Sequence, residues 1–144
     1  MKAVLLDRDG VINQDSANFI KSPDEFQPIP GSLRAIARLN AAGYQVGVAT
    51  NQSGIARGLF TEATLAAMHA RLDTLLAREN GRIDRLIYSR AGPDSDSYRR
   101  KPNPGMLFEL LEYFEANASE TLYIGDSYRD IQAARTAHCR PVLV

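Results

Sequence analysis

The sequence predicts an α/β fold: an open, parallel, five-stranded sheet with helices on both faces. Three observations support it. Five short apolar segments lack the alternation of half-buried strands, which indicates burial on both sides. Segments of helical periodicity separate them, so strands and helices alternate, as in sheets built with right-handed crossovers. A length of 144 residues also fits a single domain, over residues 1–144.

The expected strands are the five apolar segments, and the expected helices lie between or after them. The strands are predicted at 3–6, 45–49, 85–88, 121–124 and 141–144. One helix should end at Gly43, the next should lie between Thr61 and Gly81, and the last should cover about 129–137. The helix over 106–114 has the cleanest apolar stripe, with Asn103 as its N-cap and Pro104 at its first helical position.

Two connections are too long for simple turns. They cover 13–30 and 89–103, and connections of this length in a compact domain are usually functional or disordered. The first has room for a short flap but not for a folded cap domain. Phe19, Ile20 and Lys21 would form this flap, although Phe19 and Ile20 could instead anchor the loop to the core.

The composition excludes several classes of function. Lys plus Arg number 17 and Asp plus Glu number 17, so the net charge of zero creates no field that attracts nucleic acid or an acidic membrane. The single cysteine, Cys139, cannot form an internal disulfide, and the first apolar segment meets Asp7 after four residues. We therefore expect a reduced, soluble, cytoplasmic protein, monomeric or weakly self-associating, that binds neither nucleic acid nor membrane.

Polar clusters follow three of the predicted strands. Asp7-Arg8-Asp9-Gly10 follows the first, Thr50-Asn51-Gln52-Ser53-Gly54 the second, and Gly125-Asp126 through Asp130 the fourth. A further basic run, Arg99-Arg100-Lys101, precedes a helix. Each cluster alone is also compatible with an ordinary turn, a helix cap or a solvated basic segment.

Together, these clusters would converge on one crevice, because the carboxyl ends of parallel strands share an edge. The acids of the first and fourth strands would repel one another there unless a divalent cation and a lysine neutralised them. Mg²⁺ suits such a site, since it prefers oxygen ligands and keeps waters that a phosphate displaces. The residue types are those of phosphoryl transfer, but the G-x-x-x-x-G-K-[ST] loop of P-loop nucleotide-binding proteins is missing from the sequence.

The motifs resemble those of the haloacid dehalogenase superfamily of aspartate-nucleophile phosphatases, which have a Rossmann-like sheet. Its four motifs match Asp7-x-Asp9, Thr50, Lys101 and Gly125-Asp126-x-x-x-Asp130 in order. The longer segments 7–13, 50–58 and 100–106 are similar to the D-glycero-D-manno-heptose 1,7-bisphosphate phosphatase family, with histidinol-phosphate phosphatases as relatives.

The resemblance implies roles for the matching residues. Asp7 would be the nucleophile and Asp9 the general acid and base. Mg²⁺ would be held by Asp7, the Asp9 main-chain carbonyl and Asp126, while Thr50, Asn51 and Lys101 would hold phosphate oxygens. Asp130 would brace Lys101 or a loop amide, or orient a metal-bound water. The residues expected to contact the rest of the substrate carry donors beside these motifs; they are Asn13, Gln52, Ser53, Arg57 and Arg100.

One part of the pattern is missing. Members of this family often bind structural zinc through three cysteines and a histidine before the Arg-Lys-Pro motif. Ser89, Ala91, Ser97 and Arg99 stand at those positions here, and their side chains cannot replace thiolates on zinc. We therefore predict no zinc, and expect Cys139 and both histidines to be ordinary core or surface residues.

Three functions remain open at this point. The first is a Mg²⁺-dependent phosphatase that removes the 7-phosphate of a heptose 1,7-bisphosphate, in carbohydrate metabolism leading to lipopolysaccharide. The second is a phosphatase for histidinol phosphate or another small phosphomonoester, because the catalytic set handles the phosphoryl group and not the alcohol behind it. The third is a non-catalytic binding homologue.

Overall fold

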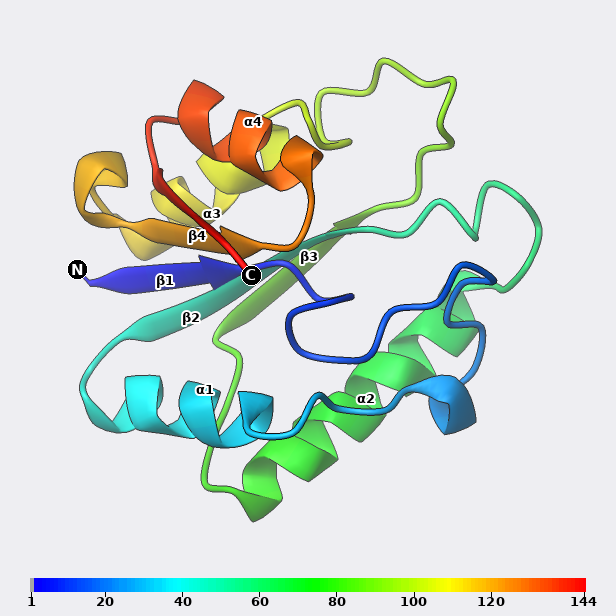
Figure 1. The fold of residues 1–144 in the computed structure, drawn as a ribbon, viewed down its shortest axis with the longest axis horizontal. Coiled ribbons are helices and arrows are strands. Elements are labelled where there is room, and N and C mark those ends of the chain that lie inside the picture. The colour runs from blue at the N-terminus through cyan, green and yellow to red at the C-terminus, as the bar shows by residue number, and fades with distance from the viewer. Residues whose placement is uncertain (1) are drawn as a thin grey trace.

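The computed structural model describes residues 2–144 and confirms the predicted parallel sheet (Figure 1). Its strands lie side by side in the order β3-β2-β1-β4-β5, and every neighbouring pair is parallel. The strands are β1 (Ala3–Leu6), β2 (Gln45–Asn51), β3 (Arg85–Ser89), β4 (Leu122–Gly125) and β5 (Arg140–Leu143). Each apolar segment of the sequence is therefore a strand, shifted by no more than two residues at either end.

Helices cover both faces of the sheet, as expected. They are α1 (Ser32–Ala41), α2 (Glu62–Arg78), α3 (Gly105–Phe114) and α4 (Tyr128–Thr136), with short 3₁₀ turns at Pro23–Glu25 and Ala118–Glu120. In Figure 1, α1 and α2 lie on one side of the sheet and α3 and α4 on the other. The two 3₁₀ turns were not predicted, because they occupy single turns within connections.

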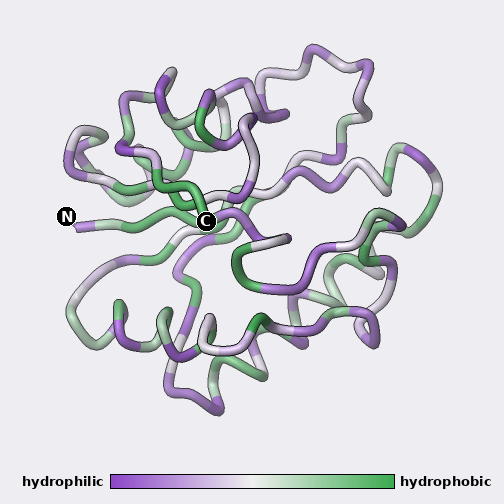
Figure 2. The backbone as a smooth tube through the Cα atoms, in the orientation of Figure 1, coloured by the Kyte–Doolittle hydropathy of each residue, from purple (hydrophilic) through white to green (hydrophobic). Residues whose placement is uncertain are grey.

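The core consists of two apolar layers, one on each face of the sheet. Along β1, Ala3 and Leu5 pack with the residues of α3 and α4, whereas Val4 and Leu6 pack with those of α1 and α2. A continuous apolar strand is thus buried on both faces, and each such leucine contributes about 1.5–3 kcal/mol of transfer free energy. Figure 2 shows β1 in green and the chain turning purple directly after it, where the acidic motif begins.

The start of α3 differs from the prediction by one residue. Pro104 is its N-cap and Gly105 its first residue, so Asn103 lies outside the helix. The physical reason is that the Asn103 side chain is used elsewhere: its Nδ2 donates to the main-chain oxygen of Ser97 at 2.9 Å. Asn103 therefore fastens the preceding loop instead of capping the helix.

The end of α2 also differs slightly. The helix stops at Arg78, and Asn80, with φ +60°, takes the left-handed conformation expected of Gly81. The Gly81 amide donates back to the carbonyl of Leu76 at 2.9 Å, which closes the helix end. Asparagine tolerates this conformation better than most residues, so both residues form the stop signal.

The strand order places a ligand-binding crevice beside β1. The chain runs outward from β1 through β2 to β3 on one side and through β4 to β5 on the other. Ligands in such sheets bind at the carboxyl ends of the strands, where the connections diverge. The Asp7 amide still donates to the Ile124 carbonyl at 2.9 Å, so the motif after β1 starts directly beside the end of β4.

No helix within residues 2–144 is both long enough and apolar enough to cross a bilayer.

Candidate active site

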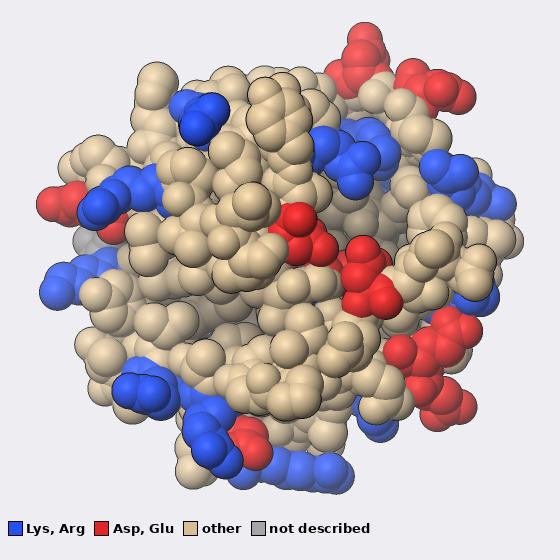
Figure 3. All heavy atoms as spheres, viewed as in Figure 1, with Lys and Arg blue, Asp and Glu red and all other residues tan. Residues whose placement is uncertain are grey.

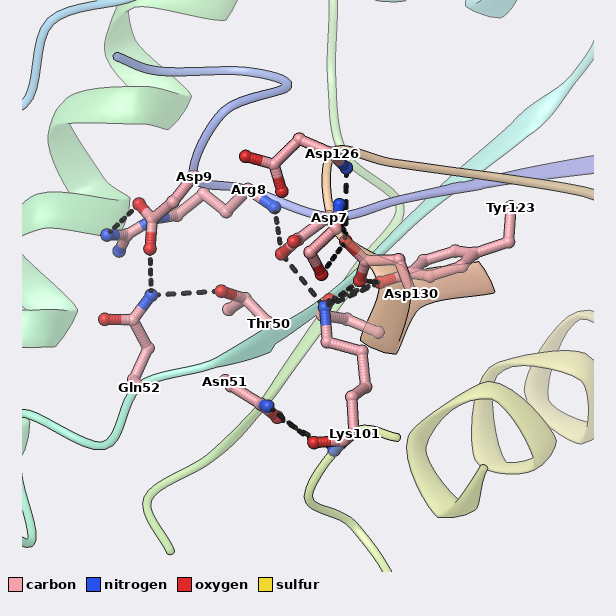
Figure 4. Close-up of polar contacts among 12 residues, drawn as sticks. Asp7, Arg8, Asp9, Thr50, Asn51, Gln52, Lys101, Tyr123, Asp126 and Asp130 are labelled. Carbon is pink, nitrogen blue, oxygen red and sulfur yellow. Dashed lines mark hydrogen bonds and ion pairs between the residues drawn. The ribbon is translucent and has the colours of Figure 1, made fainter. Parts of the chain in front are cut away.

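Asp7 lies at the end of β1, between the ends of β2 and β4 (Figure 4). Its Oδ1 is 3.0 Å from Lys101 Nζ and accepts the Arg8 amide at 2.7 Å. Burial raises the pKa of Asp7 from 3.8 to about 7, in spite of the lysine charge, and the carboxylate of Asp130 adds to this. Asp7 is therefore a carboxylate with little hydration, whose charge the neighbouring cation must balance.

Lys101 comes from the loop before α3 and is almost fully buried. Besides the ion pair with Asp7, its Nζ donates to Asp130 Oδ1 at 2.7 Å, to the Tyr123 hydroxyl at 2.7 Å and to the Ala49 carbonyl at 2.9 Å. These oxygens come from β2, β4 and α4. The ammonium group is thus held at one point among the strand ends.

Asn51 holds the main chain of this loop. Its Oδ1 accepts from the Lys101 amide and its Nδ2 donates to the Lys101 carbonyl, both at 3.0 Å. A bond in each direction fixes a loop residue against the end of β2. The structure thus shows Asn51 as the residue that positions Lys101, and its side chain also lines the pocket described below.

Asp130, in the first turn of α4, organises the other side of the site. Its Oδ2 accepts from the amides of Asp126 and Ser127 at 3.1 and 3.2 Å. Burial opposes its ionisation, but the charge and hydrogen bond of Lys101 hold the pKa of Asp130 below its usual value. Lys101 thus favours the ionised form of both carboxylates, and at Asp7 burial outweighs it.

The acidic side chains fit a divalent cation. Carboxylate oxygens of Asp7, Asp126 and Asp130 lie within 4.8 Å of one another, and burial raises the pKa of Asp126. Gly10 makes this approach possible, because a Cβ at its position would lie 1.8 Å from Asp126 Oδ2. Asp130 is already occupied by Lys101 and two amides, so Asp7 and Asp126 are the carboxylates best placed to hold a metal.

Asp9 points away from this acidic cluster (Figure 4). Its Oδ1 accepts from Arg8 Nη2 at 2.7 Å, Arg8 Nε at 3.0 Å and Asn13 Nδ2 at 2.9 Å. Its Oδ2 accepts from Gln52 Nε2 at 3.1 Å, and the same nitrogen donates to the Thr50 hydroxyl at 3.0 Å. Asp9 is thus an ordered carboxylate whose neighbours are donors rather than acids.

A pocket opens over these residues at the carboxyl edge of the sheet. Figure 3 shows acidic and basic side chains next to one another on this face, around a hollowed region. The lining residues come from four connections; they are Asp7, Asp9, Asp15, Ser16, Phe19, Ile20, Asn51, Gln52, Ser53, Arg100, Lys101, Ser127, Arg129 and Asp130. The structure therefore brings most of the predicted site residues together.

Four predicted residues do not line this pocket. One is Asp126, whose carboxylate belongs to the acidic cluster with Asp7 and Asp130. Asn13 is fully buried and donates to Asp9, and the Thr50 side chain is buried beside Gln52. The Arg57 guanidinium lies 5.2 Å from the ring centre of Phe19, so it packs on the long connection after β1. Asn13 and Thr50 thus hold Asp9 and Gln52, which do line the pocket.

Sequence reasoning missed two residues of the site. Tyr123 looked like one more apolar residue of a buried strand, yet its hydroxyl bonds to Lys101 and Asp130. A tyrosine in an otherwise aliphatic strand was the available signal, because a buried hydroxyl needs a partner. Arg129 lies inside the motif that ends at Asp130, and its position two residues after the β4–α4 turn places it at the pocket.

Comparison with known proteins shows the family of the chain. The model of the haloacid dehalogenase-like hydrolase family matches residues 12–138. The chain is 52% identical over 141 residues to D-glycero-beta-D-manno-heptose-1,7-bisphosphate 7-phosphatase of Pseudomonas aeruginosa, covering 98% of this chain and 79% of that protein. It is 50% identical to the enzyme of the same name in Pseudomonas putida, covering 100% of this chain and 82% of that protein.

Solved structures show the same likeness. The crystal structure of D,D-heptose 1,7-bisphosphate phosphatase from B. bronchiseptica, complexed with magnesium and phosphate, superposes with a TM-score of 0.97. It is 49% identical, over 99% of this chain and 80% of that one. A HAD-like phosphatase from Mesorhizobium loti superposes with a TM-score of 0.85 at 40% identity, over 96% of this chain and 69% of that one.

Proposed function

Because the chain belongs to the haloacid dehalogenase-like hydrolase family, we propose that it is a Mg²⁺-dependent phosphomonoesterase that removes the 7-phosphate of D-glycero-D-manno-heptose 1,7-bisphosphate. The observation that carries this proposal is the meeting of Asp7, Lys101 and Asp126 at the ends of β1 and β4. The carboxylate oxygens of the two aspartates lie close enough to share one cation, and Lys101 is 3.0 Å from the first of them.

In this proposal Asp7 attacks phosphorus and forms an aspartyl phosphate. Asp7 is bonded through Oδ1 to Lys101 and the Arg8 amide, which orients the carboxylate at the pocket. A nucleophile held in line with its target gains rate because little further ordering is needed in the transition state. Water then hydrolyses the aspartyl phosphate and restores Asp7.

Asp9 is proposed to transfer the proton. It would protonate the leaving alkoxide in the first step and take a proton from the attacking water in the second. Gln52 and Asn13 bond to its carboxylate and keep it facing the pocket. Lys101 and Asn51, which both line the pocket, are proposed to hold the phosphate oxygens, whereas the buried Thr50 hydroxyl orients Gln52.

Mg²⁺ is proposed to bind the carboxylates of Asp7 and Asp126 and the main-chain carbonyl of Asp9. When bound, it would neutralise negative charge on the transferred phosphoryl group. The donor set supports this choice, since the cluster offers hard carboxylate oxygens and Gly10 leaves room for Asp126. The relative from B. bronchiseptica was crystallised with magnesium and phosphate.

The second phosphate of the substrate is proposed to bind at Arg100 and Arg129, which line the same pocket. Burial and the positive charges of Arg129 and Arg57 lower the pKa of Arg100, so the three cations lie close to one another. A cluster of like charges is stabilised by a dianion, and guanidinium groups bind phosphate with two donors at once. Ser53 lines the same pocket. Arg57 lies behind it, against the ring of Phe19, which is also a lining residue.

We also propose that the segment before Lys101 holds no zinc. Hydrogen bonds fasten it instead: Arg100 Nη1 donates to the Ala91 carbonyl at 2.9 Å, and the Gly105 amide donates to the Tyr98 carbonyl at 2.9 Å. Asn103 adds its bond to Ser97. Metal content measured by mass spectrometry on the purified protein should show no stoichiometric zinc, and one zinc per chain would contradict this.

Initial rates on four substrates test the function. With Mg²⁺ present, heptose 1,7-bisphosphate in each anomer, histidinol phosphate and an aryl phosphate are compared at equal concentrations. We expect the bisphosphate to have the highest kcat/KM, and the β anomer to exceed the α anomer. Arg129→Met should raise KM for the bisphosphate about 10–100-fold and leave the aryl phosphate almost unchanged, since only the former carries a second phosphate.

Two outcomes would contradict the proposal. No preference for the bisphosphate over histidinol phosphate would refute the substrate. Equal inactivity of the wild type and Asp7→Asn with Mg²⁺ present would refute the catalytic role and favour a non-catalytic binding protein.

A further inference from the structure

Arg8 stands between the two aspartates of the acidic motif, yet its side chain is completely buried. Two of its nitrogens, Nε and Nη2, donate to one atom, Asp9 Oδ1, at 3.0 and 2.7 Å. Arg8 is not among the residues that line the pocket. A buried guanidinium is costly unless its donors are satisfied, so its place directly behind a reactive carboxylate requires an explanation.

Helix α2 and the first long loop hold the rest of this guanidinium. Arg8 Nη1 lies 3.2 Å from His69 Nε2, and the guanidinium carbon lies 5.4 Å from the ring centre of Phe26. Burial, together with the Arg8 charge, lowers the pKa of His69 to about 4. The imidazole is therefore neutral near pH 7, and a neutral ring can accept a hydrogen bond from Arg8 through Nε2.

The two oxygens of Asp9 are consequently unequal. Oδ1 accepts three hydrogen bonds, two from Arg8 and one from Asn13, whereas Oδ2 accepts one longer bond from Gln52. A carboxylate oxygen with three donors has no lone pair left for a proton. Oδ2 is therefore the oxygen of Asp9 that can carry one.

We propose that Arg8, held in place by His69 and Phe26, is a positioning residue that directs Asp9 Oδ2 toward the leaving oxygen of the substrate. The inference rests on the proposed function, since it requires Asp9 to be the general acid. In that step the Asp7 oxygen forms a bond to phosphorus, the bond from phosphorus to the leaving oxygen breaks, and its electron pair stays on that oxygen. The proton on Asp9 Oδ2 passes to the same oxygen, which leaves as the alcohol.

Leaving-group dependence distinguishes positioning from general stability. An alkyl phosphate needs its alkoxide protonated, whereas 2,4-dinitrophenyl phosphate releases a stable anion. The quantity compared is kcat/KM, because it reports the steps up to the first phosphoryl transfer and excludes hydrolysis of the aspartyl phosphate. We expect Asp9→Asn and Arg8→Met to lose about 10²-fold on heptose bisphosphate and less than about 10-fold on the aryl ester.

Two further variants control this experiment. Arg8→Lys keeps the positive charge, on one donor nitrogen instead of three, and should recover part of the lost rate on the sugar phosphate. Arg71→Lys is the matched control, because Arg71 of α2 donates to the Phe26 carbonyl at 3.3 Å and makes no contact with Asp9 in the described chain. It should leave both rates unchanged.

His69 provides a second route if Arg8→Met does not fold. His69→Leu removes the nitrogen acceptor of Arg8 Nη1 and leaves it only the Met68 sulfur at 3.9 Å, whereas His69→Gln places an amide oxygen near the lost nitrogen. The leucine variant should lose several-fold on the sugar phosphate alone, and the glutamine variant should lose less. Equal losses on both substrates in folded Arg8→Met, or in His69→Leu, would overturn the inference.

Asp9→Asn separates this inference from the proposed function. If Asp9→Asn loses equally on both substrates, the general-acid role of Asp9 fails and the inference fails with it. If Asp9→Asn is selective and the Arg8 and His69 variants are not, only the positioning role of Arg8 is refuted.

Discussion

Asp7 and Asp9 belong to one short motif, but their carboxylates lie in opposite surroundings. Asp7 faces Lys101 and two other acids at the ends of β1 and β4, and burial raises its pKa to about 7. Asp9 faces donors from its own loop and from the end of β2, and it is bonded to a buried arginine. The side that Asp7 occupies favours binding of a cation, whereas the side that Asp9 occupies orders a proton carrier.

The turn at Gly10 separates these two surroundings. Gly10 has φ +81°, a conformation that other residues rarely adopt, and it leads the chain away from the sheet directly after Asp9. Residue type alone therefore does not assign a role, because two identical side chains two positions apart differ in every side-chain partner. Four substitutions test this difference.

Asp7→Asn should have the largest effect. The amide keeps the shape of the side chain but removes the nucleophilic charge, so kcat should fall by at least about 10⁴-fold on alkyl and aryl phosphates alike. Single-turnover phosphate release with Mg²⁺ measures this. A loss confined to alkyl phosphates would mean that Asp7 acts in proton transfer, and the contrast with Asp9 would disappear.

Lys101→Met should lower kcat by about 10²–10³-fold, since it removes a fixed positive charge from the transition state. It should also destabilise the fold by about 3–5 kcal/mol, because Asp130 and Asp7 lose their buried cation. Activity and urea unfolding are measured on the same preparation. An unchanged midpoint of unfolding would show that Lys101 is not the counterion of the buried acids.

Gly10→Ala should weaken Mg²⁺ binding by about 10–100-fold, because the added methyl would lie 1.8 Å from Asp126 Oδ2 and displace that ligand. Gly58→Ala is the matched control, since Gly58 has φ +74° and nothing within 4 Å of its added Cβ. Both variants should lose stability through backbone strain, by about 1 kcal/mol. Calorimetric titration with Mg²⁺ separates the two, and equal affinities would remove Asp126 from the metal site.

His69→Gln should have the smallest effect. It changes the free energy of unfolding through the residue that contacts Arg8 behind Asp9. The pKa of His69 is about 4 in the folded protein, below its ordinary 6.5, so the unfolded chain takes up the proton first as pH falls. The free energy of unfolding should therefore decrease from pH 6.5 toward pH 4 in the wild type. The glutamine variant lacks this titration and should gain about 1–2 kcal/mol relative to the wild type over that range.

Urea unfolding at pH 7 and pH 4.5 measures this difference, and the other titrating groups cancel between the two proteins. Parallel pH dependence in both proteins would show that His69 is protonated as easily in the folded state as in the unfolded chain. The contact with Arg8 Nη1 would then be repulsive at acid pH, contrary to the neutral acceptor described above.

The elements of the fold were predictable because their signals are local. An apolar segment such as Ala3–Leu6 indicates a strand that is buried on both faces. The apolar stripe over 106–114 has the periodicity of a helix, which does not depend on its packing partners. The ends of elements were less predictable. Asn103 has the composition of a cap, but a carbonyl six residues earlier in the chain competes for its side chain.

The convergence of the site was also predictable, for a topological reason. Asp7, Thr50 and Asp126 each follow a strand, and parallel strands place their carboxyl ends at one edge. The orientation of each side chain was not predictable in the same way. Asn13 was expected to contact substrate, and its neighbourhood in the sequence gave no sign that it is buried against Asp9.

The sequence by itself determined which residues are available for chemistry and at which edge of the sheet they gather, since hydrophobic periodicity is local and parallel strands place their carboxyl ends at one edge. Only the tertiary structure decided which side chains reach the pocket and which ones hold others in place. Asn51 fixes Lys101 across fifty positions, and His69 reaches Arg8 across sixty-one. Such contacts depend on how helices and loops pack over the finished sheet, because a side chain takes its partners from what lies nearest in space.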